Sequence, residues 1–234
     1  MKPKVLVESW RQFLREGVSG KIKVFLDMDG VLVDFAQGLA DAINRDLANP
    51  DNPAFSKSRK KKLKKLMDYD GPDRQEPITV EILDTVLAKK DAKQEMTGWE
   101  TQLKRYQFSP VVANYDHWVN LSKAEGCDEL IQECFNLVGE ENVYILSAPV
   151  DDESIRAKRD WLSMNTPFPD ERIFITKTKE DIPAQFDGVT CVLIDDRIKY
   201  KTKFEAAGGI GIHHEPQSSM IAVEKSLNKL KGMI

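Results

Sequence analysis

The chain has 234 residues, of which 41% are hydrophobic and 31% charged, and its formal net charge is −4. This size suits one large domain or a core domain with an inserted second domain, in an ordinary water-soluble protein. The negative net charge gives no general attraction to nucleic acid or anionic membrane, so any basic binding surface has to be local.

Cysteine usage and the N-terminal sequence together predict a cytoplasmic protein. The three cysteines form no Cys-x-x-Cys pair and only three histidines are present, which argues against a structural zinc site. The segment after Met1 is charged and lacks the apolar core of a signal peptide. No segment approaches the roughly 18 uninterrupted apolar residues of a membrane span, so we expect no membrane partner.

The first expected elements are a helix over residues 5–16 and a buried strand over 22–27 that ends at Asp27. About 115 residues separate this strand from the next apolar run, which is too long for a simple crossover. Within this stretch the sequence predicts helices over three ranges, 36–48, 56–68 and 78–90. We therefore predict a mostly helical cap domain at 36–120, inserted into a core formed by 1–35 and 121–234.

The second half of the chain alternates between apolar runs and helical patterns. Strands are expected at 143–146, 173–175, 189–194 and 209–212, and helices at 126–138, 151–164 and 216–231. This alternation predicts an α/β fold, a doubly wound parallel sheet with helices on both faces. Ligands of such sheets bind beyond the carboxyl ends of the strands, where Asp27, Ser147 and Asp195 are expected.

Carboxylates dominate the predicted site. Asp27 and Asp29 follow the first strand, Gly30 permits a tight turn, and Asp195 and Asp196 end another strand. Acidic groups that meet at one sheet edge repel each other, and a hard divalent cation such as Mg²⁺ removes the repulsion. An aspartate at a strand end is often only a turn or helix cap, but two acidic pairs in this order favour a metal site.

This arrangement predicts a phosphate-ester hydrolase. Asp27 would attack phosphorus, and Asp29 would protonate the leaving alcohol and then activate water. Ser147 would bind phosphate oxygens, and a lysine would neutralise the transferring group. Two lysines fit the last role: Lys179, which follows the short third strand, is preferred over Lys158, which lies on an expected helix.

Three segments resemble motifs of the haloacid dehalogenase (HAD) superfamily. Asp27-Met28-Asp29-Gly30-Val31-Leu32 is similar to its first motif, Ile145-Leu146-Ser147 to its second, and Leu193-Ile194-Asp195-Asp196 to its acidic fourth motif. The resemblance covers roughly 22–35 and 140–214. It implies a Rossmann-like core, Mg²⁺ bound by Asp27, Asp29, Asp195 and Asp196, and an aspartyl-phosphate intermediate.

A narrower resemblance is to the 5′(3′)-deoxyribonucleotidase branch. It rests on the extended first motif up to Phe35, on Ser147-Ala148-Pro149, and on the segment around Lys179. It implies a nucleoside monophosphate substrate, with Phe35 at the base. Ala148 departs from the branch, which has serine there, and the gap between Lys179 and Asp195 is longer than in the branch.

A lysine-rich run at 57–65 keeps nucleic acid open as a partner, but the solvated face of a cap helix is the preferred explanation of this run, so nucleic-acid binding is not the expectation. Three functions therefore remain: a nucleotidase, a phosphatase for another small ester or a nucleic-acid phosphate end, and a non-catalytic binding protein of the same fold. The sequence does not decide the oligomeric state.

Overall fold

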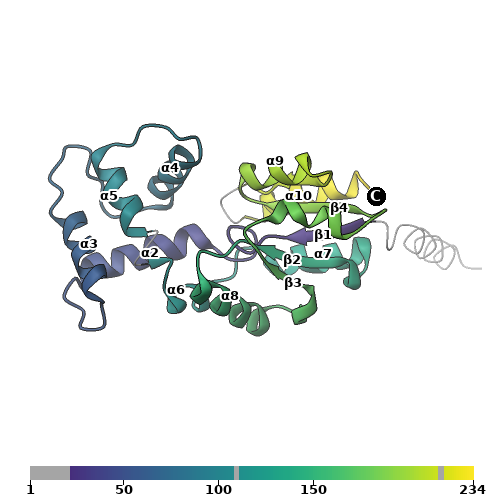
Figure 1. Cartoon of the computed structure of the whole chain (residues 1–234), viewed down its shortest axis with the longest axis horizontal. Coiled ribbons are helices and arrows are strands. Elements are labelled where there is room, and N and C mark those ends of the chain that lie inside the picture. The colour runs from purple at the N-terminus through teal and green to yellow at the C-terminus, as the bar shows by residue number, and fades with distance from the viewer. Residues whose placement is uncertain (1–21, 108–110, 216–218) are drawn as a thin grey trace, which may run out of the picture. The chain divides into compact units, whose positions relative to one another are not determined.

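The computed structural model describes residues 22–107, 111–215 and 219–234, and the chain divides into two compact units (Figure 1). The sheet unit comprises Met1–Asp34, Lys123–Pro149 and Asn165–Ile234, and the helical unit comprises Phe35–Ser122 and Val150–Met164. The helix predicted over residues 5–16 lies outside the described residues.

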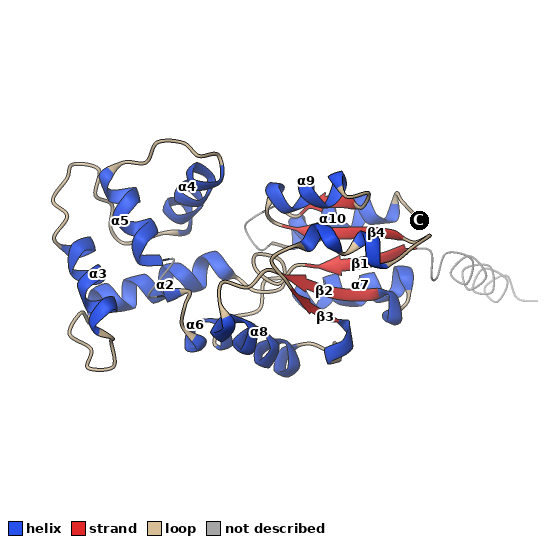
Figure 2. Cartoon of the chain, in the orientation of Figure 1, coloured by secondary structure: helices blue, strands red, loops and turns tan. Residues whose placement is uncertain are grey.

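The sheet unit is built on five parallel strands in the order β3-β2-β1-β4-β5 (Figure 2). The strands are β1 (Ile22–Leu26), β2 (Val143–Ser147), β3 (Ile173–Ile175), β4 (Thr190–Asp195) and β5 (Ile210–His213). Its helices are α7 (Cys127–Val138), α9 (Ile198–Ala206) and α10 (Met220–Lys231). The order places β1 in the centre, and after β3 the chain crosses to the other side of β1.

Side chains along the central strands alternate between the two faces of the sheet. Phe25 and Leu193 are paired between β1 and β4 and belong to a buried cluster with Phe204 of α9. The residues that precede them, Val24 and Val192, point to the opposite face and are also fully buried. Helix α7 contacts β1 and β2. Both faces are apolar, as expected for a parallel sheet covered by helices on both sides.

The helical unit contains α2 (Phe35–Ala48), α3 (Lys57–Met67), α4 (Val80–Asp91), α5 (Gly98–Tyr106), α6 (Tyr115–Val119) and α8 (Asp152–Asn165, of which Asn165 belongs to the sheet unit). Ser56, Thr79 and Thr97 cap the N-termini of α3, α4 and α5, and their hydroxyls accept backbone N–H groups. Helix α3 buries Leu63 and Leu66, and α4 buries Leu83 and Val86, so each helix turns an apolar side to the interior of the unit.

The α/β fold, the five strands and the six helices expected within the described residues are confirmed to within a few residues at each end. Helices α5, α6 and α9 were not expected individually. The Thr97–Glu100 capping box could have revealed α5, whereas α9 buries only Phe204 and so has little periodicity.

The division of the chain differs from the predicted ranges at Val150–Met164. Helix α8 was predicted in the core domain but packs within the helical unit, because Trp161 donates its indole N–H to the Leu121 carbonyl at 2.7 Å and Tyr115 donates to Asp160 at 2.7 Å. A role of the helical unit as a cap stays a prediction. No helix among the described residues has the length and apolar character to cross a membrane.

Candidate active site

The candidate site lies at the carboxyl ends of β1 and β4. Strands β2 and β3 lie on one side of β1 and strands β4 and β5 on the other, and ligands of parallel sheets bind where the strand order changes side in this way. Asp27 directly follows β1, and its backbone N–H extends the ladder by donating to the Ile194 carbonyl at 2.9 Å. Asp195 is the last residue of β4, and Asp196 follows it. The topology therefore brings together residues that are far apart in sequence.

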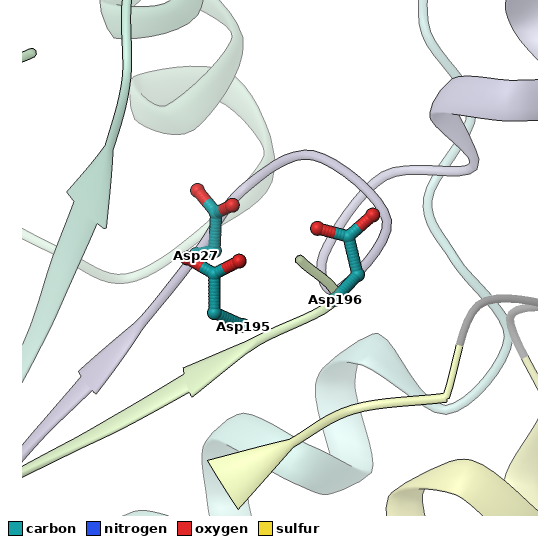
Figure 3. A group of neighbouring side chains, drawn as sticks. All are labelled: Asp27, Asp195 and Asp196. Atoms are coloured by element: carbon teal, nitrogen blue, oxygen red, sulfur yellow. The ribbon is translucent and has the colours of Figure 1, made fainter. Parts of the chain in front are cut away.

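The strand register explains why two of these carboxylates share one face. Asp27 lies two residues beyond Phe25 and Asp195 two residues beyond Leu193, and those two residues are register partners. Because side chains alternate with a period of two, both carboxylates point to the same face. Oxygens of Asp27, Asp195 and Asp196 lie within 4.8 Å of one another (Figure 3).

Lys179 provides the cation of this cluster. It begins a 3₁₀ turn, Lys179–Asp181, and its side chain is fully buried. Its Nζ lies 2.9 Å from Asp27 Oδ1 and 2.7 Å from Asp195 Oδ2. Burial lowers the pKa of Lys179, but the charges of Asp27 and Asp195 outweigh burial and raise the pKa above its usual range, so the ammonium stays protonated.

One lysine does not neutralise three carboxylates. Burial, and then the charge of Asp27, raise the pKa of Asp195 to about 6, against the opposing effect of Lys179. Burial, and then the charges of Asp195 and Asp27, raise the pKa of Asp196 well above its usual value. Asp196 Oδ1 is buried and has no hydrogen-bond partner within the described residues. An unsatisfied carboxylate oxygen in an all-oxygen cluster fits a hard divalent cation.

Gly30 lets the loop after β1 approach Asp196. Its φ is +72°, and a Cβ there would lie 2.5 Å from Asp196 Oδ2. The loop is closed by hydrogen bonds from Leu32 N and Val33 N to the Met28 carbonyl, at 2.9 and 3.0 Å. Asp29 lies in this loop, is partly exposed, and its charge contributes to the raised pKa of Asp196. Its part in binding a metal stays a prediction.

The other predicted residues divide between the two units. Ser147 is buried at the end of β2, and its carbonyl accepts Thr176 N at 2.9 Å. Phe35 belongs to the helical unit and stacks on Trp118 with ring centroids 5.4 Å apart. Lys158 also belongs to that unit, where its Nζ lies 4.3 Å from the Trp118 ring centre. Lys179, the lysine preferred from the sequence, lies beside Asp27 and Asp195.

Three further residues support the carboxylates and were not predicted. The Tyr200 ring lies 4.7 Å from Lys179 Nζ, Arg197 N donates to Asp195 Oδ1 at 2.8 Å, and His213 Nε2 lies 2.9 Å from the Asp196 carbonyl oxygen. Tyr200 and Arg197 follow the acidic pair closely in sequence, which is a signal that could have suggested them. His213 lies at the end of β5, and only the strand order brings it here.

No family model matches the sequence, and no curated protein sequence matches it significantly. Solved structures of similar fold include a protein described as a haloacid dehalogenase-like hydrolase from Burkholderia xenovorans, at 15% identity over 80% of this chain and 79% of that chain, with a TM-score of 0.43. A hydrolase from Pseudomonas syringae is 14% identical over 91% and 99% of the two chains, with a TM-score of 0.44.

A HAD family enzyme from Bacteroides thetaiotaomicron, solved as an aspartate-to-alanine variant with magnesium and inorganic phosphate, is 11% identical over 86% and 96% of the two chains, with a TM-score of 0.36. Likeness at these identities and TM-scores carries no argument about the activity of this chain.

Proposed function

We propose that the protein is a Mg²⁺-dependent phosphomonoesterase of the HAD superfamily that acts through an aspartyl-phosphate on Asp27. The observation that carries the proposal is the cluster of Asp27, Asp195 and Asp196 within 4.8 Å, with an unsatisfied oxygen on Asp196. These three residues would hold Mg²⁺, which when bound would offset their charge and polarise a phosphate oxygen.

The contacts of Asp27 suit it to nucleophilic attack. Met28 N donates to Oδ1 at 2.8 Å and Lys179 Nζ approaches the same oxygen at 2.9 Å, so the carboxylate is held in place through Oδ1. The other oxygen, Oδ2, is assigned to the attack on phosphorus. A phosphorus–oxygen bond to Asp27 forms as the ester bond to the leaving alcohol breaks.

Asp29 is assigned the proton transfers. It gives a proton to the leaving alcohol in the first step and removes one from the water that hydrolyses the aspartyl-phosphate in the second. The products are the alcohol, inorganic phosphate and a regenerated Asp27. Ser147 is assigned to the phosphate oxygens, while Lys179 positions Asp27 and offsets charge in the transition state.

We further propose a nucleoside monophosphate as the substrate, on the resemblance of the first motif and of the Lys179 segment to the deoxyribonucleotidases. The assignment of Phe35 to the base stays a prediction. A nucleic-acid phosphate end is the second candidate substrate, because α3 carries seven basic residues. A non-catalytic binding protein is disfavoured, because three carboxylates that lie within 4.8 Å of one another, with one buried lysine between two of them, destabilise a fold that has no use for them.

The test is phosphate release with Mg²⁺ from deoxy- and ribonucleoside monophosphates, sugar phosphates and 3′-phosphorylated oligonucleotides. We expect turnover of nucleotides, lost by at least ~10⁴-fold in Asp27→Asn. The matched control is Asp187→Asn, an exposed aspartate of the sheet unit, which should leave the rate unchanged. Absence of turnover, or an active Asp27→Asn variant, would overturn the mechanism. Turnover of sugar phosphates alone would overturn only the substrate.

A further inference from the structure

Helix α3 has an unusual charge for this chain. It carries seven basic residues and no acidic residue over Lys57–Met67, although the whole chain has a net charge of −4. One side of the helix faces the interior of the helical unit, because Leu63 and Leu66 are buried. Its N-terminus is capped by Ser56, whose Oγ accepts Arg59 N at 3.1 Å. The opposite side of the helix is therefore held toward solvent.

Four lysines form a single stripe on that outer side: Lys57, Lys61, Lys64 and Lys65. All four are exposed, and their spacing of three and four residues places them on one face of the helix. At the rise of an α-helix the stripe is about 12 Å long. We call these four residues the lysine stripe.

The lysine stripe is not neutralised by the protein. Arg59 is the basic residue of α3 that has an internal partner, since its Nη2 lies 2.6 Å from Asp46 Oδ2. Over the described ranges, none of the six lysine side chains of α3 makes a hydrogen bond or ion pair. A helix that needs only solubility can alternate its charges, as α9 does with Lys201 and Glu205 at 2.6 Å.

We propose that the lysine stripe binds the phosphate backbone of a nucleic acid without reading its sequence. Lysines are point charges that suit phosphates and lack the planar fork that reads guanine. At roughly 3.4 Å of rise per phosphate, a 12 Å stripe faces three or four phosphates of one strand. An anionic membrane fits less well, because the apolar side of α3, Leu63 and Leu66, is buried and cannot enter a bilayer.

This inference does not depend on the proposed function. The lysine stripe belongs to the helical unit and Asp27 to the sheet unit, so binding and hydrolysis can be tested separately. If both hold, a nucleic-acid phosphate end becomes the leading substrate. If only binding holds, the protein is a nucleic-acid-binding protein with some other activity at the carboxylates.

The test is a titration of a fluorescent 20-nucleotide single strand with the full chain, in EDTA so that no turnover occurs. With four phosphate contacts, the affinity of the wild-type protein should fall about 50-fold between 50 and 200 mM NaCl. Replacing Lys57, Lys61, Lys64 and Lys65 together by Gln should weaken binding at least ~10-fold at 50 mM NaCl and remove most of the salt dependence. Glutamine has nearly the helix propensity of lysine, so circular dichroism should be unchanged.

A second variant keeps the same change in net charge but leaves α3 intact. It replaces four exposed lysines of the sheet unit by Gln, namely Lys203, Lys225, Lys229 and Lys231. We expect its affinity to match the wild-type protein. Equal weakening in both variants, or no weakening in the α3 variant, would overturn the proposal. The proposal would also be overturned if the wild-type protein did not bind the oligonucleotide at 50 mM NaCl, whether or not it binds phosphatidylserine vesicles.

Discussion

Each unit of the molecule buries carboxylates against a cation, but the two clusters differ in their balance of charge. In the helical unit, Asp46 Oδ2 accepts Arg59 at 2.6 Å and also the Tyr106 hydroxyl, so one carboxylate has two donors. In the sheet unit, Asp27 and Asp195 share Lys179, and the neighbouring Asp196 has an Oδ1 with no hydrogen-bond partner among the described residues. A balanced cluster stabilises the fold, whereas an unbalanced one needs a further cation, which is why we assign function to the sheet unit.

The largest expected effect comes from removing the cation of each cluster. Leaving a buried carboxylate unpaired destabilises a protein by about 3–5 kcal/mol, so Lys179→Met and Arg59→Met should both lower the free energy of unfolding by this order. Only Lys179→Met should also lower phosphatase activity, by at least ~100-fold. Urea unfolding and steady-state kinetics measure the two effects.

Lys203→Met is the control for this comparison, because the Lys203–Glu180 ion pair is largely exposed at the lysine and should contribute little. A Lys179→Met variant as stable as Lys203→Met would show that the buried lysine does not hold the carboxylates together. An Arg59→Met variant that loses activity while folded would remove the contrast between the two clusters.

The next effect concerns the approach of Gly30 to Asp196. Alanine at a left-handed position costs about 1–2 kcal/mol, and at Gly30 its Cβ would also lie 2.5 Å from Asp196 Oδ2. Crowding of this kind adds about 1–3 kcal/mol, so Gly30→Ala should lower the free energy of unfolding by roughly 3 kcal/mol and weaken Mg²⁺ binding. Denaturant unfolding and a Mg²⁺ titration are the measurements.

Gly188 supplies a matched control in the same unit. Its φ is +71°, nearly that of Gly30, but a Cβ there meets no described atom within 4 Å. Gly188→Ala should therefore show the backbone strain alone and leave Mg²⁺ binding intact. Similar losses in the two variants would mean that the loop relaxes away from Asp196.

Mg²⁺ should stabilise the sheet unit and not the cluster of the helical unit. At 100 times its dissociation constant, a ligand that binds only the folded state adds about 2.7 kcal/mol to the free energy of unfolding. We expect a gain of this order in the wild-type protein and in Arg59→Met, and none in Asp196→Asn, measured by thermal or urea unfolding with and without Mg²⁺. Stabilisation that survives in Asp196→Asn would place the ion elsewhere.

The smallest effect concerns His117, a histidine buried in the helical unit, and so contrasts a buried base there with the buried acids of the sheet unit. Burial, and then the charges of Arg45, Arg59 and Lys158, lower the pKa of His117 to about 4. The unfolded chain, with a histidine pKa of about 6.5, binds the proton first as the pH falls. Stability is therefore complete above pH 6.5 and declines toward pH 4.

Between pH 7 and pH 5 this loss amounts to about 2 kcal/mol. His117→Phe keeps an aromatic ring beside Phe35 and Trp118 but cannot take up a proton, so its acid-side loss should be smaller by this amount in urea unfolding. Parallel pH profiles for the two proteins would contradict the assignment of His117 as a buried neutral histidine.

The two units also differ in which of their features could be predicted from the sequence. The strands were found because buried runs such as Val143–Ser147 are apolar and end in polar residues, a pattern that local sequence carries. The paired cluster of Asp46, Arg59 and Tyr106 was not anticipated, because its members lie on three helices and only their packing brings them together. The packing of α8 within the helical unit was not anticipated for the same reason.

For this protein, the sequence by itself determined the α/β class and the polar residues at the carboxyl ends of β1, β2 and β4, because side-chain periodicity and strand-end chemistry are local properties. Tertiary structure alone decided which of these residues meet. Parallel pairing of β1 with β4 places Asp27 beside Asp195, and the turn after β3 brings Lys179 to both, while Lys158 packs on Trp118 in the other unit. Contacts of this kind depend on strand order and helix packing, which residue spacing does not encode.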